Sequence, residues 1–212
     1  MPTNSSSMRR RVGAFATVAV LGVCVVPAAA LGGSGKSVKL HSGSVTITFS
    51  PSVYAALTKQ TTGPFAVNNT MAPVVPATEK TSQFSFPISG GKLTLSTLKG
   101  KVSTKGGINL MDSKTVGGFF TTTSQGELVS FRFNFGGSAQ LILNFVGSST
   151  TKNVPFATLV TKKAKHSVHG KSVSVTHVAV KLTKTGAQLM NSFVSGFKTG
   201  EQIGTASIAA KS

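Results

Sequence analysis

Apolar and polar residues alternate with a period of two through most of the chain beyond residue 43. In residues 44–49 every second residue is apolar, and Phe131, Phe133 and Phe135 share one side of a later segment. Successive side chains of a strand point to opposite faces, so this period predicts half-buried β-strands. Short strands separated by glycine-containing turns predict a mainly β protein, an antiparallel β-sandwich or barrel.

A strand followed by a short helix is predicted near each end of this β-rich region. Ser50 precedes Pro51 and an apolar segment that runs to Leu57, and Thr183 precedes a second such segment that runs to Met190. Serine and threonine are favoured residues before the first helical turn, and proline is tolerated within it. We therefore expect two short helices that pack on the ends of the same sandwich or barrel.

Two stretches predict reversals or irregular chain. Ser89-Gly90-Gly91 separates two apolar segments and predicts a tight hairpin turn. Residues 61–80 contain three prolines and an Asn-Asn pair, and they predict a long loop.

The first 30 residues have the three parts of a signal peptide. Three arginines at positions 9–11 precede an uncharged apolar run, and Ala28-Ala29-Ala30 supplies a small-residue cleavage pattern after which we expect cleavage. Three alternatives remain open: an uncleaved membrane anchor, lipidation of Cys24, and a twin-arginine signal that uses the first two arginines. The sequence thus predicts a signal peptide at 1–30, a Gly/Ser/Lys-rich lead-in at 31–42 and a single β domain at 43–212. We expect a secreted, extracellular protein, with retention at the cell envelope as the alternative location.

The charge balance indicates an anionic partner outside the cell. The chain has 22 Lys and Arg against 4 Asp and Glu, and without the three leader arginines 19 basic residues remain. All of these but Arg132 are lysines, which attract polyanions diffusely rather than reading nucleotide sequence as arginine forks do. We expect binding to anionic cell-wall polymers or lipid head groups and no specific nucleic-acid recognition. Membrane attachment is expected only if the leader is retained or Cys24 is lipidated.

The residues needed for most catalytic and metal sites are scarce. One cysteine excludes a disulfide framework and a cysteine-based zinc centre, and four acidic residues are too few for a calcium site together with a catalytic carboxylate pair. No serine lies in a Gly-x-Ser-x-Gly elbow. His166, His169 and His177 lie within twelve residues, but lysines crowd the same segment and oppose a cation. We expect no enzyme activity, no catalytic residue and no metal site. Tyr54, the single tyrosine, is expected on the first helix with its hydroxyl at the rim of the core.

Six segments, taken in order, resemble the HtaA-type domain over about residues 43–210. These segments are Phe86–Gly91, Leu98–Val102, Gly106–Leu110, Val154–Leu159, Leu182–Ala187 and Gly200–Ile203. The family consists of exported or wall-linked actinobacterial β-rich modules, some of which take part in haem acquisition. The resemblance therefore implies an exported β-rich binding module.

The resemblance also implies where a haem would be held. Haem-binding members share a Gly-His-x-Gly-x-Leu stretch, whose histidine touches haem, and a tyrosine ligand near the start. In the matching stretch of this chain Thr104 stands at the histidine position, and Tyr54 lies in the tyrosine region at a different spacing. We therefore expect a non-enzymatic envelope-binding module that takes no cofactor.

The alternative is a carrier of haem or of another small apolar ligand. It would use Tyr54 and one of the three clustered histidines. The candidate ligand-binding residues are Tyr54, Thr104, His166, His169 and His177.

Overall fold

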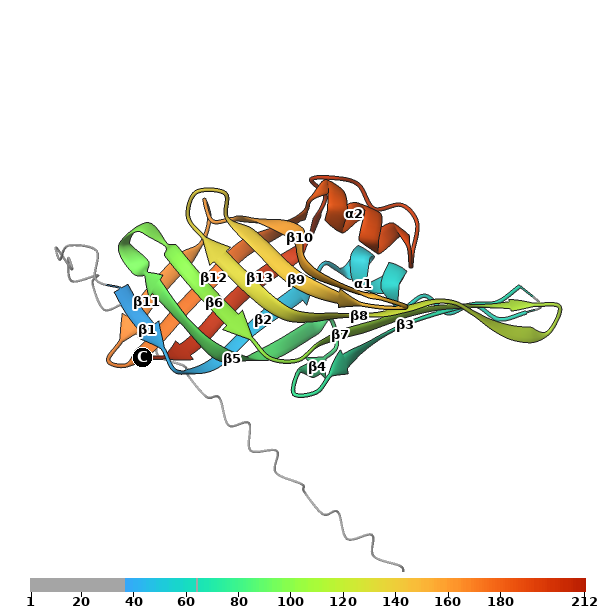
Figure 1. Ribbon diagram of the computed structural model, residues 1–212, viewed down its shortest axis with the longest axis horizontal. Coiled ribbons are helices and arrows are strands. Elements are labelled where there is room, and N and C mark those ends of the chain that lie inside the picture. Colours follow the sequence, from blue (N-terminus) through green and yellow to red (C-terminus); the bar gives the residue numbers. More distant parts are fainter. Residues whose placement is uncertain (1–36, 64) are drawn as a thin grey trace, which may run out of the picture. The chain divides into compact units, whose positions relative to one another are not determined.

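The computed structural model describes residues 37–63 and 65–212. The expected leader, its cleavage site and Cys24 lie outside the described residues. Thirteen described strands, all paired antiparallel, form a single sheet (Figure 1). Among the described residues no helix is long and apolar enough to cross a bilayer.

Eight of these strands close into a barrel. In order around the barrel they are β5 (Gln83–Thr94), β2 (Ser42–Phe49), β13 (Gln202–Lys211), β12 (Ser172–Leu182), β10 (Thr150–Val160), β9 (Gln140–Val146), β8 (Phe119–Phe135) and β6 (Lys99–Thr104). The short strand β6 pairs with β8 on one side and with β5 on the other, which completes the ring. The predicted mainly β, antiparallel fold is confirmed, and of the two architectures it allowed the chain adopts the barrel.

The remaining strands extend the barrel wall. They are β1 (Ser37–Leu40) and β4 (Thr78–Lys80), which pair with β5, β11 (Lys165–His169), which pairs with β12, and β7 (Gly107–Val116) and β3 (Val67–Val74), which follow β8. Strand β1 lies inside the expected lead-in at 31–42. Strands β3 and β7 and the first part of β8 continue past the barrel as a three-stranded arm (Figure 1).

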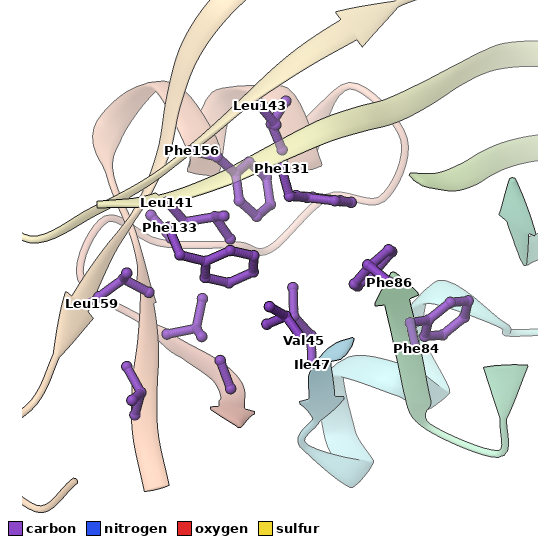
Figure 2. Packing of buried hydrophobic residues seen from close by; sticks show 14 of the residues in the cluster. Val45, Ile47, Phe84, Phe86, Phe131, Phe133, Leu141, Leu143, Phe156 and Leu159 are labelled. Carbon is purple, nitrogen blue, oxygen red and sulfur yellow. The ribbon is translucent and has the colours of Figure 1, made fainter. Parts of the chain in front are cut away.

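Phenylalanine and branched side chains fill the barrel. Phe84 and Phe86 of β5 and Phe131 and Phe133 of β8 are all fully buried (Figure 2). The ring centroids of Phe86 and Phe131 are 4.6 Å apart. Burial of one such side chain contributes roughly 1.5–3 kcal/mol, so this alternating set stabilises the barrel together with the other buried apolar residues. The predicted shared face of the phenylalanines at 131–135 is confirmed.

The loop predicted at 61–80 is wrong, because strands β3 and β4 lie within it. Strand β3 is an edge strand that pairs only with β7, so proline at position 73 is tolerated there, and its buried side carries only Asn69 and Met71. The far end of the arm exposes large apolar side chains: Phe65 is 77% and Phe119 is 79% exposed.

The hairpin predicted at Ser89–Gly91 is also wrong. Strand β5 continues through these residues, and the chain reverses instead at the 3-10 turn Leu95–Thr97, after which Leu98 adopts a left-handed conformation. Gly91 serves close packing, since a Cβ atom there would lie 2.6 Å from the carbonyl oxygen of Lys101 on β6. A glycine required for close approach of two strands has the same sequence signal as a glycine required for a turn.

The two helices, α1 (Pro51–Leu57) and α2 (Lys184–Asn191), form where the pattern predicted them. The Thr183 hydroxyl oxygen accepts a hydrogen bond from the Gly186 N–H at 2.9 Å and caps α2. Both helices lie at one end of the barrel (Figure 1), where Ala56 of α1 and Phe197 beyond α2 line a common hollow.

We predict that Gly186→Ala destabilises the protein. Helix propensity alone favours alanine by about 1 kcal/mol, but a Cβ at position 186 would overlap the carbonyl oxygen of Phe156 on β10. Pushing α2 off the barrel should therefore lower the free energy of unfolding by about 1–3 kcal/mol, measured by urea denaturation. Thr185→Ala, at an exposed position of the same helix, is the matched control. Equal or greater stability of Gly186→Ala would contradict the close packing.

Candidate functional site

The single tyrosine lies in a pair with an acidic residue. Val53 and Leu57 bury one face of α1 and leave Tyr54 half-buried beside them. The Tyr54 hydroxyl donates a hydrogen bond to Oε1 of Glu79 at 3.0 Å. Glu79 lies on β4, whose pairing with Phe84 of β5 fixes its place beside α1. We call Tyr54 and Glu79 the phenol–carboxylate pair.

The surroundings of this pair raise the pKa of Tyr54 above its ordinary value. The hydrogen bond to Glu79 is the largest cause, followed by burial and by the negative charge of Glu79. Each of these favours the protonated phenol over the phenolate. At neutral pH the phenol is therefore held as a hydrogen-bond donor.

Thr104 lies in the same part of the molecule but inside the core. Its side chain is 6% exposed, and its hydroxyl donates to the carbonyl oxygen of Phe131 at 3.3 Å. Two residues further on, Gly106 lies against the backbone of Ala77, which precedes Glu79 by two residues. The fold thus brings the Thr104 segment near the phenol–carboxylate pair, while the Thr104 hydroxyl is engaged within the barrel wall.

A buried amide ties α1 to the arm. Asn69 of β3 is 4% exposed, and its Nδ2 donates to the carbonyl oxygen of Ala56 at 3.2 Å. Its Oδ1 atom is also buried and has no hydrogen-bond partner within the described part of the chain. The helix that carries Tyr54 is therefore held from the arm as well as from the barrel.

The three clustered histidines do not join Tyr54. His166 and His169 are exposed on β11, and His169 pairs with Ser172, which pairs with Lys211 of β13. Lys211 lies opposite Ser42 at the start of β2, whereas α1 follows the other end of β2. His169 therefore lies at the opposite end of the barrel from Tyr54, beside an open hollow of about 380 Å³.

His177 lies on β12, next to Thr176, which pairs with Lys165 of β11. It is exposed, and its Nδ1 is 2.9 Å from the hydroxyl oxygen of Thr176. Across residues 37–63 and 65–212, no three His, Cys, Asp or Glu side chains gather in a group that could hold a metal ion.

Sequence reasoning missed a concentration of positive charge around His177. A hollow of about 570 Å³ lies on the outer face of the barrel wall. Its basic lining consists of Lys162, Lys163, Lys165, Lys181 and His177. We call this the lysine hollow. The first three lysines were visible as a cluster in the sequence, but only strand pairing places Lys181 and His177 with them.

We predict that the tyrosinate absorbance of the folded protein titrates at a pH above the ordinary tyrosine pKa of about 10. The signal reports Tyr54 alone because the chain has one tyrosine and no tryptophan. Glu79→Gln should move the titration to lower pH, whereas Glu127→Gln should leave it unchanged.

The raised pKa of Tyr54 also fixes how the free energy of unfolding changes with pH. The folded chain holds the Tyr54 proton more tightly than the unfolded chain, so the contribution of this group to stability is complete below about pH 10. It is lost as the pH rises through the pKa of the folded state. An unaltered titration in Glu79→Gln would contradict the role of the pair.

Comparisons with known proteins agree with this fold. The HtaA family model, described as Htaa, matches residues 58–208. The crystal structure of the C-terminal domain of HtaA from Corynebacterium glutamicum is similar over 82% of this chain and 98% of that chain, with a TM-score of 0.61 and 17% identity. The crystal structure of the haem-binding protein HtaB from the same organism is similar over 83% and 96%, with a TM-score of 0.56 and 17% identity. A comparison with curated protein sequences gives no match.

The expectation that the chain takes no cofactor is wrong. It rested on the threonine at position 104, where haem-binding members are expected to carry a histidine. A protein of the same fold, HtaB, binds haem. A phenol oxygen can ligate haem iron without an imidazole ligand, so the lack of one histidine does not exclude the cofactor. The resemblance itself is confirmed, because the family model covers more than half of the sequence: the chain belongs to the HtaA family.

Proposed function

We propose that this chain is a non-enzymatic haem-binding module in which Tyr54 is the iron ligand and Glu79 is its partner. The observation that carries the proposal is the phenol–carboxylate pair, which supplies an oxygen ligand and a proton acceptor 3.0 Å apart. Membership in a family whose fold includes the haem-binding protein HtaB supports the choice of ligand.

The chemistry of these donors fits a ferric haem. Haem, when bound, supplies an iron centre for which a tyrosine oxygen is a known protein ligand. A phenol must give up its proton to serve as an oxyanion ligand, and Oε1 of Glu79 already accepts the hydrogen bond through which that proton would leave. Val75, on the turn that leads to β4, is 85% exposed and offers apolar surface in the same segment. Thr104 has no ligating role in this proposal, because its hydroxyl is engaged with Phe131.

We predict that ferric haem binds with the visible absorption of a phenolate-ligated iron and that Tyr54→Phe abolishes these bands. The loss of affinity in Tyr54→Phe should be at least about tenfold, and Glu79→Gln should weaken binding about 10–100-fold because the phenol oxygen loses the carboxylate that orients it. The measurement is a titration of the purified full chain with haem, followed by absorbance.

His166→Ala, His169→Ala and His177→Ala are the controls, since none of these side chains lies with Tyr54. The proposal fails if Tyr54→Phe retains both the spectrum and the affinity. It also fails if one of the histidine variants loses them.

A second proposed function is retention at the cell envelope by charge attraction to anionic wall polymers or lipid head groups. It is supported by the 19 basic residues beyond the leader arginines against 4 acidic ones, and by their concentration at the lysine hollow. Export through the signal peptide, with cleavage after Ala30, belongs to the same proposal.

We predict that the mature protein sediments with isolated cell wall at low salt and is released as salt increases, because salt screens exposed charges. Sequencing of its N-terminus and assay of medium and envelope fractions test export. Binding that does not change with salt, or no binding at any salt concentration, would contradict electrostatic retention.

A further inference from the structure

The lysine hollow is formed where one strand replaces another beside β12. Residues Ala179–Leu182 of β12 pair with β10, whereas Ser172–Thr176 pair with β11. The connection between β10 and β11 turns sharply, with the Ala164 N–H donating to the Thr161 carbonyl oxygen at 2.9 Å. Between Thr176 and Ala179, neither β10 nor β11 pairs with this side of β12. The lysines of the connection between β10 and β11 lie beside this gap.

Small side chains make the floor of the hollow. Ala179 pairs with Val160 of β10 on one side and with Thr205 of β13 on the other, and all three line the hollow. Lys181 lies two residues beyond Ala179 on the same face and pairs with Gln202. The lysines therefore surround a shallow floor that no large side chain fills.

A distortion of β12 adds His177 to the lining. The pairing of β12 with β13 shifts register between Val175 and Val178, and His177 has a φ of +61°. Non-glycine residues rarely adopt this conformation, and such bulges redirect side chains. Val175 and Val178 both stay buried, while His177 lies exposed beside Lys165 and Lys181 in the hollow.

No carboxylate compensates these charges. The lining contains no Asp or Glu, and none of its four lysines has an ion-pair partner in the described part of the chain. The acidic residue nearest in sequence to this lining is Glu201, whose Oε2 accepts a hydrogen bond from the Lys198 N–H at 2.9 Å. Four uncompensated ammonium groups around one hollow repel each other and attract an anion that carries several charges.

We propose that the lysine hollow is a binding site for an oxyanion with two or more linked phosphate groups, such as a segment of a phosphate-containing polymer. Each phosphate presents several acceptor oxygens, which match the three donors of each lysine ammonium group. A volume of about 570 Å³ accommodates a short segment rather than a single small ion. This site deepens the proposed envelope retention by assigning it to one place, and it does not depend on haem binding.

The test uses the full chain and tripolyphosphate as the probe, with affinity measured by calorimetry at several salt concentrations. The hollow variant carries Lys→Gln at positions 162, 163, 165 and 181. The control variant carries Lys→Gln at four exposed lysines elsewhere, at positions 59, 105, 114 and 198, and so has the same net charge. We expect the hollow variant to lose at least about tenfold in affinity and the control to lose about twofold or less.

A double variant, Lys162→Gln with Lys163→Gln, changes only the connecting turn and keeps the test valid if the fourfold variant fails to fold. It should lose affinity in the same direction. Equal losses in the hollow and control variants would overturn the site and leave only diffuse attraction. The absence of tripolyphosphate binding to the unaltered chain would also overturn it.

Two further experiments separate the possible outcomes. Vesicles of phosphatidylglycerol and phosphatidylcholine distinguish lipid phosphate from polymer phosphate, and binding to vesicles without binding to tripolyphosphate would overturn the proposal. Sedimentation with isolated cell wall tests retention itself. If the unaltered chain binds tripolyphosphate but not cell wall, the proposed retention fails and the site stands. If the hollow variant binds cell wall as well as the unaltered chain does, the assignment of retention to the hollow fails.

Discussion

Closure of the barrel by β6 is the constraint on which the rest of the structure depends. This six-residue strand pairs with both β5 and β8, and it thereby joins two walls whose phenylalanines meet in the interior (Figure 2). With the ring closed, the eight barrel strands of the described chain are all paired on both sides, and one continuous core stabilises them. The lysine hollow lies on the outer face of this closed wall, and the phenol–carboxylate pair lies at one end of it.

The phenol–carboxylate pair depends on that closure through strand register. Strand β4 can present Glu79 to Tyr54 only because β4 pairs with β5, and α1 begins directly after β2, the next strand in the ring. The donor and the acceptor are 25 residues apart in the chain. They meet at one end of the barrel, near the segment of Thr104, whose own hydroxyl is engaged in the core.

Prediction from the sequence succeeded where several apolar side chains alternate along a segment, and it failed where that alternation is weak or a glycine has two possible roles. The alternating phenylalanines at 131–135 and the Thr183 cap have local signals, so strands and helices could be assigned from them. Strand β3 has no such signal because it lies at the edge of the arm, and Gly91 signals a turn while it serves strand contact. Among the site residues, Tyr54 was identified as unusual, but neither Glu79 nor Lys181 could be assigned a partner.

The sequence by itself determined the class of fold, the place of both helices, the family and the excess of positive charge, because each of these depends on local periodicity, on motifs or on composition. Only the tertiary structure decided that the sheet closes, that the histidines lie away from Tyr54, and which lysines gather with His177. The reason is physical: strand pairing joins residues far apart in the chain, and a shift of one residue in register moves a side chain to the other face of the sheet.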